Sequence, residues 1–182
     1  RFKNMINFNT YPSIEAQISA ISDDIAYNNH DIQDGINANL FKLEELVEIN
    51  FFKDIYKKYK RKINKQNYKI ATYQIVRDSI DLMIKDLIKN TKKNLVDSNI
   101  KNLKDINKTN SLMVNFSDDI KNSDNEIRYF LKTKMYNNKE VLKKNNKGKS
   151  IVKRLFKKIK LNPGKFISKK QLSRDKYRAI SD

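Results

Sequence analysis

Glycine and proline are scarce in this chain, which holds only three glycines and two prolines in 182 residues. Tight turns and β-hairpins depend on these residue types, because glycine adopts positive φ and proline presets the turn. A fold of many short strands would lack its turn signals here, whereas long helices need few of them. We therefore expect an all-α protein.

Apolar residues recur at helical spacing in several segments. The spacing i, i+3, i+4, i+7 places such residues on one helix face, which then packs against a core. The expected helices cover residues 13–41, 42–60, 67–96, 124–136 and 149–161, and the polar residues 97–125 are expected to form a long connection. Pro12 and Ser13 signal the start of the first helix, and Asn162-Pro163-Gly164 signals the end of the last.

The expected helix over residues 67–96 has one apolar stripe that we assign to the core. Its members are Ile70, Tyr73, Ile80, Ile84, Leu87 and Ile88. Arg77 lies among them and has two interpretations. Its guanidinium can bind a phosphate through two hydrogen bonds, or it can pair with Asp81 one turn later. We favour the ion pair.

The first expected helix has two opposite faces. Its apolar face is formed by Ile14, Ile18, Ile21, Ile25 and Ile32. The other face carries three carboxylates, a phenol and the only histidine, which are Asp23, Tyr27, His30, Asp31 and Asp34. Carboxylates at this spacing repel one another, and no lysine or arginine lies between Ser13 and Leu40 to compensate them. The face is either a solvated acidic surface or a binding face for a multivalent cation or a cationic partner.

Gly35 interrupts the pattern near the end of this helix. Three interpretations are open, namely a bend, a close approach of another segment to the backbone, or the helix end.

The first helix also carries a family resemblance. Residues 15–17 read EAQ and residues 23–36 read DDIAYNNHDIQDGI. This string resembles the signature helix of the dGTP triphosphohydrolase branch of the HD-domain metal-dependent phosphohydrolases, and residues 68–95, 127–141 and 151–163 resemble later helices of that family.

The resemblance implies a multi-helix HD-domain-like bundle and hydrolysis of dGTP to deoxyguanosine and inorganic triphosphate. It places the last ligand of a divalent metal ion, such as Mg²⁺ or Mn²⁺, on Asp23. It places the deoxyribose pocket on Tyr27 and Asp31. It further implies a homo-oligomer and a response to single-stranded nucleic acid.

One departure from the family pattern is important. The other three metal ligands of the family, a His and a His-Asp pair, precede the signature helix, and no histidine precedes Asp23 here. His30-Asp31 lies within the signature helix and is not that pair. We therefore interpret the chain as the C-terminal part of a longer protein and expect it to be inactive alone. We expect residues 1–96 to be the C-terminal part of the catalytic domain, and residues 97–182 to be a basic helical C-terminal region that is truncated at its end.

Composition excludes several kinds of site. The chain has no cysteine, which excludes disulfides and thiolate ligands, and its single histidine excludes a centre built from several histidines of this chain. No apolar run approaches the roughly 20 residues that span a bilayer, and no secretory signal pattern is present. We expect a cytoplasmic protein.

Charge is divided unevenly along the chain, whose net charge is +18. Residues 13–50 hold eight acids and one base, whereas residues 51–182 hold 13 acids and 36 bases. The basic part supports a rival function, a non-enzymatic helical module that binds nucleic-acid phosphates. Residues 149–161 could equally lie on an anionic membrane surface, or be a solvated helix whose lysines reflect AT-rich codons.

Overall fold

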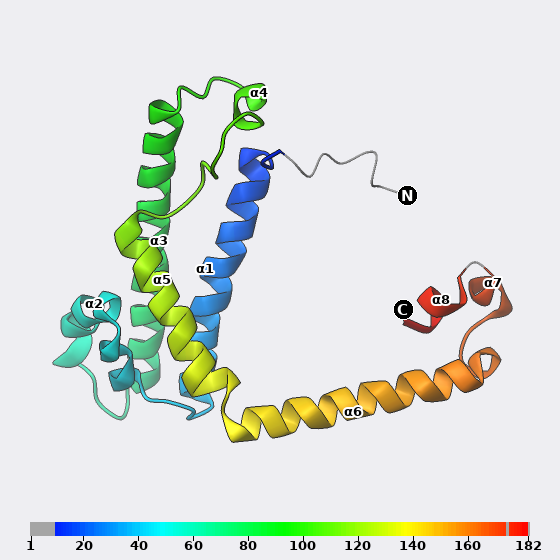
Figure 1. Cartoon of the computed structure of the whole chain (residues 1–182). Coiled ribbons are helices and arrows are strands. Elements are labelled where there is room, and N and C mark those ends of the chain that lie inside the picture. Colours follow the sequence, from blue (N-terminus) through cyan, green and yellow to red (C-terminus); the bar gives the residue numbers. More distant parts are fainter. Residues whose placement is uncertain (1–9, 174, 182) are drawn as a thin grey trace. The chain divides into compact units, whose positions relative to one another are not determined.

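The computed structural model describes residues 10–173 and 175–181, and every regular element in these ranges is a helix (Figure 1). The α-helices are α1 (Ile14–Asn37), α2 (Asn50–Lys60), α3 (Tyr68–Asp97), α4 (Leu103–Ile106), α5 (Asp118–Leu131), α6 (Lys139–Leu161), α7 (Lys169–Leu172) and α8 (Lys176–Ser181). Two short 3-10 helices, η1 (Leu43–Glu48) and η3 (Pro163–Lys165), and one π-helical turn, η2 (Lys132–Tyr136), complete the set. The all-α prediction is confirmed.

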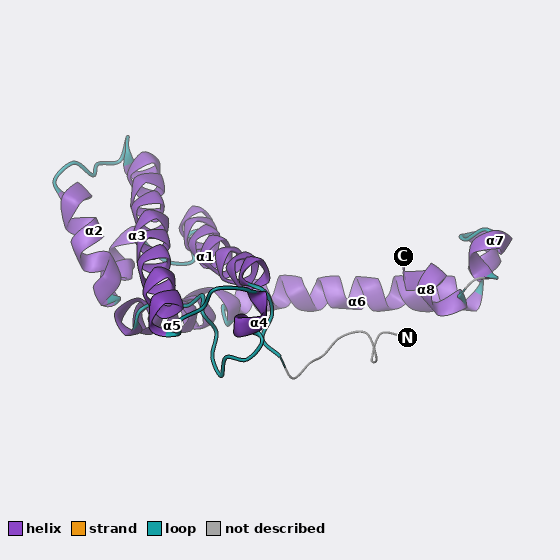
Figure 2. Ribbon diagram, turned by 90° about the horizontal axis from the view of Figure 1, so that it is seen from above, coloured by secondary structure: helices purple, strands orange, loops and turns teal. Residues whose placement is uncertain are grey.

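The chain divides into two compact units between Met135 and Tyr136. In the first unit, α1, α3 and α2 form a layer, and α5 lies across one side of that layer, in contact with α1 and α2 (Figure 2). The second unit contains α6, α7 and α8, with α8 packed on both of the others. The expected boundary between residues 96 and 97 concerns the longer protein and stays a prediction.

Helix α1 has a well-defined start. The Ser13 hydroxyl accepts a hydrogen bond from the amide of Ala16 (3.4 Å), which satisfies one of the free N–H groups of the first turn. A hydrogen bond from its own backbone amide, and then one from Ser13, lower the pKa of Glu15 in this turn. Helix α1 continues through Gly35, where an added methyl group would collide with the ring of Phe41. The close-approach interpretation of Gly35 is confirmed.

The core of the first unit joins α1, η1, α2, α3 and α5. Its fully buried apolar side chains are Ile32, Leu43, Leu46, Phe52, Ile55, Ile75, Met83, Ile127 and Leu131. The single helix expected over residues 42–60 is wrong, because η1 and α2 are separate elements. Ile49 between them has extended backbone (φ −90°, ψ 120°) and buries its side chain in the core.

The core stripe expected on α3 is largely wrong. The structure buries Ala71, Thr72, Ile75, Val76, Ser79, Met83 and Leu87. Ile70, Tyr73, Ile84 and Ile88 are instead exposed by 61, 38, 42 and 51 %. The physical reason is that α3 is apolar on two sides, and its neighbours α1 and α2 cover only one of them.

The connection expected over residues 97–125 is shorter than predicted, because it contains α4 and because α5 begins at Asp118. The apolar pattern of α5 is interrupted by Asp124, a carboxylate at a core-facing position between Ile120 and Ile127. Asp124 is only 8 % exposed. A buried carboxylate hides the helical period from a search for apolar residues, which explains the late start predicted for this helix.

In the second unit, α6 starts ten residues before the predicted position of 149, and the Asn138 side chain caps it by accepting from the Glu140 amide (2.9 Å). Helix α6 ends at Leu161, immediately before Asn162-Pro163, so the predicted end is confirmed. It has no buried residue.

Candidate functional site on helix α1

Asp23, Tyr27 and Asp31 lie at successive four-residue steps along α1, so their side chains leave the same side of the helix. Asp23 and Tyr27 are exposed, Tyr27 by 64 %, and Asp31 is half-buried. His30 and Asp34, also exposed, belong to the same side. The structure thus brings all five residues onto one face of α1 that does not belong to the core.

The rotation of α1 is set by contacts on its other sides. Ile25, Ile32 and Ile36 are buried, and between them Asn29 is completely buried. The Asn29 amide nitrogen donates to the carbonyl of Ile25 (2.8 Å) and lies 3.5 Å from the sulfur of Met83 on α3. These contacts leave Asp23 and Tyr27 on the solvent side.

Asp24 has a different environment from Asp23. Its carboxylate accepts from Nη2 of Arg128 on α5 (3.0 Å), and Nε of Arg128 donates to Asp124 (2.8 Å). The buried Asn28 amide donates to the other oxygen of Asp124 (3.0 Å), which closes a cluster between α1 and α5. Hydrogen bonding to Asp124, and then to Asp24, raises the pKa of Arg128 against the opposing effect of desolvation. Asp24 therefore forms part of the contact between α1 and α5.

Asp23 forms no ion pair or hydrogen bond within the described ranges 10–173 and 175–181. The two adjacent carboxylates thus differ in role. Asp24 takes part in a contact between helices, and Asp23 lies on an exposed face of α1. An exposed carboxylate with no cation beside it is suited to bind one.

The fit of a divalent metal ion follows from the donor set. Asp23 supplies an anionic oxygen, which fits one ligand position of such an ion. Across the part of the chain that the structure describes, however, no three His, Cys, Asp or Glu side chains are grouped so as to hold a metal ion. The chain can contribute a ligand but not a complete site.

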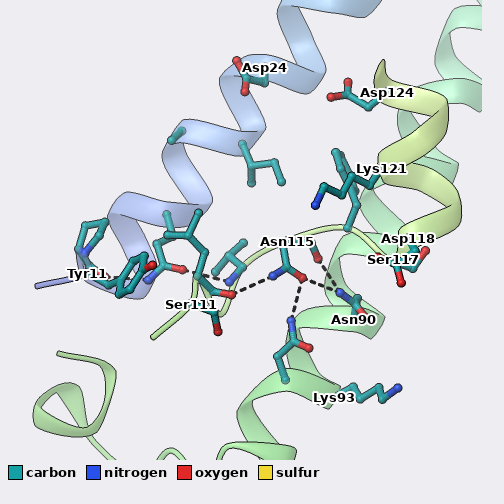
Figure 3. A pocket seen from close by; sticks show the side chains of 18 of the residues that line it. Tyr11, Asp24, Asn90, Lys93, Ser111, Asn115, Ser117, Asp118, Lys121 and Asp124 are labelled. Carbon is teal, nitrogen blue, oxygen red and sulfur yellow. Dashed lines mark hydrogen bonds between the residues drawn. The ribbon is translucent and has the colours of Figure 1, made fainter. Parts of the chain in front are cut away.

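A large cleft lies elsewhere, between the start of α1, the segment 110–118, α3 and α5 (Figure 3). Its volume is about 930 Å³, and Asp24, Asp124 and Arg128 lie at its α5 side, whereas Asp23 does not line it. The cleft is therefore separate from the predicted site.

Hydrogen bonds within the protein satisfy many of the polar groups that line this cleft. Asn115 Oδ1 accepts from the amides of Asn90 (2.7 Å) and Asn94 (2.9 Å), and Asp86 binds both the amide and the hydroxyl of Ser117 (2.9 and 2.7 Å). The Gln17 carbonyl oxygen accepts from the amides of residues 113 and 114 (2.9 and 3.0 Å). These groups hold the segment in place and are not available to a ligand.

Sequence reasoning missed the cluster around Arg128. The signal was available in the spacing, since Asp124 and Arg128 are four residues apart, as in a helical ion pair.

The ion pair predicted between Arg77 and Asp81 is wrong. Asp81 pairs with Lys85 (2.7 Å), while Arg77 is exposed and forms no ion pair with any described residue.

Comparison with known proteins extends this picture. Residues 114–181 match the family model described as a phosphohydrolase-associated domain. A deoxyguanosinetriphosphate triphosphohydrolase-like protein of Pelagibacter ubique is 59 % identical over 181 residues, which are 100 % of this chain and 49 % of the relative. Proteins of the same name from Caulobacter sp. and Rhizobium meliloti are 30 and 32 % identical over 83 and 81 % of the chain, and over 38 and 36 % of their own lengths.

The chain thus spans about half the length, or less, of the curated relatives that it matches. None of the helices in the described ranges is both long and apolar enough to cross a membrane. The resemblance seen in the signature string is confirmed, and the chain belongs to the deoxyguanosinetriphosphate triphosphohydrolase-like family, of whose members it matches a part.

Proposed function

We propose that the longer protein containing this chain hydrolyses a deoxynucleoside triphosphate, such as dGTP, to the deoxynucleoside and inorganic triphosphate. The names of the relatives and the phosphohydrolase-associated match support this class of reaction. The single observation that carries the proposal is the shared face of Asp23, Tyr27 and Asp31, on which the Asp23 carboxylate is exposed and unpaired.

Each of these residues has a role that its chemistry suits. Asp23 would be one ligand of a divalent ion such as Mg²⁺ or Mn²⁺, which when bound polarises a phosphate and lowers the pKa of a water molecule. The other ligands would come from outside this chain. Asp31, two turns further along α1, would accept a hydrogen bond from the 3′-hydroxyl of the sugar. The exposed ring of Tyr27 between them would crowd a 2′-hydroxyl, which favours deoxyribose.

Asp23 and Asp24 offer a matched test, because they are adjacent and chemically identical. In the longer protein, Asp23→Asn should abolish metal binding and turnover, because a neutral amide replaces the anionic oxygen ligand. Asp24→Asn should keep metal and turnover, and should mainly weaken the contact to Arg128. Metal content by mass spectrometry and dGTP kinetics measure both. An Asp23 variant that retains its metal and rate would contradict the proposal.

Asp31→Asn addresses the sugar contact separately. The variant should keep its metal but bind the deoxynucleotide more weakly, by about 1.5 to 3 kcal/mol, because a charge-assisted hydrogen bond is lost. An unchanged KM and kcat would contradict the proposed contact between Asp31 and the sugar.

A second function rests on the charge of α6. Residues 139–161 carry ten bases and one acid, and α6 has no buried residue. We infer that this helix binds the phosphate backbone of single-stranded nucleic acid, as an activity in its own right or beside hydrolysis.

A further inference from the structure

Helix α3 presents a second apolar stripe, made of Ile70, Tyr73, Ile84 and Ile88. Their spacings of 3, 11 and 4 residues place them within about 60° around the helix axis. All four are exposed, by 38 to 61 %. We call this stripe the outer face of α3.

The outer face is distinct from the sides of α3 that contact other elements. Asp78 accepts hydrogen bonds from Lys58 and Tyr59 of α2, and Asp86 binds Ser117 at the start of α5. Met83 meets α1 through Asn29. By helical spacing these three positions of α3 lie well away from Ile70 and Ile88. In Figure 2, α5 and the segment before it lie on one side of the layer of α1, α3 and α2.

Arg77 lies within the outer face by the same spacing, seven residues from both Ile70 and Ile84. It is exposed and forms no ion pair with any residue of the described ranges. Its neighbours one turn away include the apolar side chains of Tyr73 and Ile80 and the carboxylate of Asp81, which pairs with Lys85 (2.7 Å). An exposed arginine that has no ion pair and lies beside apolar side chains fits a surface that is itself apolar and carries one carboxylate opposite the guanidinium.

Exposed apolar residues that gather on one face mark interaction surfaces, whereas single ones do not. Here two pairs, Ile70 with Tyr73 and Ile84 with Ile88, lie about 16 Å apart along the helix axis, with the half-buried Ile80 between them. The occupant is suggested by the relatives, since the chain accounts for only 49 % of the Pelagibacter ubique protein. We propose that the outer face of α3 is the docking surface for the remaining part of the longer protein, which would cover Ile70, Tyr73, Ile84 and Ile88 and pair a carboxylate with Arg77.

This inference rests on the same premise as the proposed function, that the chain is part of a longer protein. It requires no catalytic activity, so the two can fail separately. If the outer face is covered but Asp23→Asn retains metal and rate, only the function is wrong.

Thiol labelling of the longer protein tests the surface, and the chain itself contains no cysteine. Ile84→Cys and Ile88→Cys report on the outer face. Val96→Cys is the exposed reference on another side of α3, since Val96 is 77 % exposed, and Met83→Cys is the fully buried reference. Rates at the individual peptides are read by mass spectrometry, with the unfolded protein in denaturant as the common standard.

We expect Cys-substituted positions 84 and 88 to react at least about tenfold more slowly than position 96, and to approach the protection of position 83. Equal rates at 84, 88 and 96, with 83 still protected, would overturn the proposal. Protection at 84 and 88 that disappears on dilution would also overturn it, because the occupant would then be a second copy of the protein.

Arg77→Glu should lower the thermal midpoint of the longer protein by several degrees more than Lys92→Glu on the same helix, and equal shifts would contradict the carboxylate contact.

Discussion

The ring of Phe41 packs directly over the backbone of Gly35, at a point where a methyl group would overlap it. Phe41 is 4 % exposed and meets Phe130 of α5 edge-on, with ring centroids 4.9 Å apart. The absence of a side chain at Gly35 thus lets the segment after α1 fold back against the helix and reach α5.

Gly35→Ala should therefore destabilise the protein, although alanine normally favours a helix over glycine by about 1 kcal/mol. Displacing Phe41 is an overpacking change and should cost about 1 to 3 kcal/mol, measured by urea denaturation. Gly148→Ala in α6 is the matched control, because nothing lies within 4 Å of the added methyl group. That variant should gain helicity by circular dichroism. A stabilised Gly35→Ala protein would show that Phe41 moves aside freely.

Acid should weaken the contact between η1 and the π-helical turn η2. A hydrogen bond from Lys134 (2.7 Å), and then one from the Lys42 amide, lower the pKa of Glu45. A carboxylate whose pKa is lower in the folded state stabilises the fold above its unfolded pKa, near 4.5, and this contribution is lost as the pH falls through the folded value. Glu45→Gln should therefore flatten the loss of stability below about pH 5.

The control for this experiment is Glu126→Gln, because Glu126 is exposed and forms no ion pair with any described residue. Its variant should follow the pH profile of the unmodified protein. A Glu45→Gln profile that also follows it would show that the contact to Lys134 contributes nothing.

The chain of residues 1–182 alone should release no triphosphate from dGTP, because Asp23 is a single ligand and no group of three potential ligands exists in the described ranges. Release is measured against a blank without protein, with the longer protein as the positive control. Turnover by the isolated chain would require a site of a different kind.

Binding of single-stranded DNA should fall steeply with salt if α6 contacts phosphates, with a slope of about −0.7 for each phosphate neutralised. Lys153→Glu with Lys157→Glu should lower both the affinity and the slope. Lys92→Glu with Lys93→Glu, on exposed positions of α3, makes the same change in net charge and should have less effect. Equal losses would indicate a general effect of net charge.

Sequence reasoning was most successful where local chemistry decides the structure. Ser13 begins α1 and Asn162-Pro163 follows the end of α6, because capping and proline geometry act within a few residues. The shared face of Asp23, Tyr27 and Asp31 also follows from helical spacing alone. Their roles in metal and sugar binding stay predictions.

Sequence reasoning failed where residues far away in the sequence determine whether a side chain is buried. Helix α3 has two apolar sides, and periodicity cannot tell which of them α1 and α2 cover. Asp124 is buried because Asn28, 96 residues earlier, and Arg128 bind it, and a carboxylate at that position looks like a surface residue in the sequence. The ion pair predicted between Arg77 and Asp81 was wrong for a simpler reason, because Lys85 pairs with Asp81 instead.

The side chain of Gln17 has a consequence for how the first unit folds. Its nitrogen donates to the Pro12 carbonyl (2.8 Å), and its oxygen accepts from Met113 and Val114, which lie almost 100 residues away. Contacts of such long range require a large loop to close. The loop loses its conformational entropy before the hydrogen bonds form and compensate for that loss. The segment before α5 should therefore dock later in refolding than α1 and α3, which are separated by a shorter stretch of chain, and pulse-labelled amide exchange at Met113 and Val114 measures the delay.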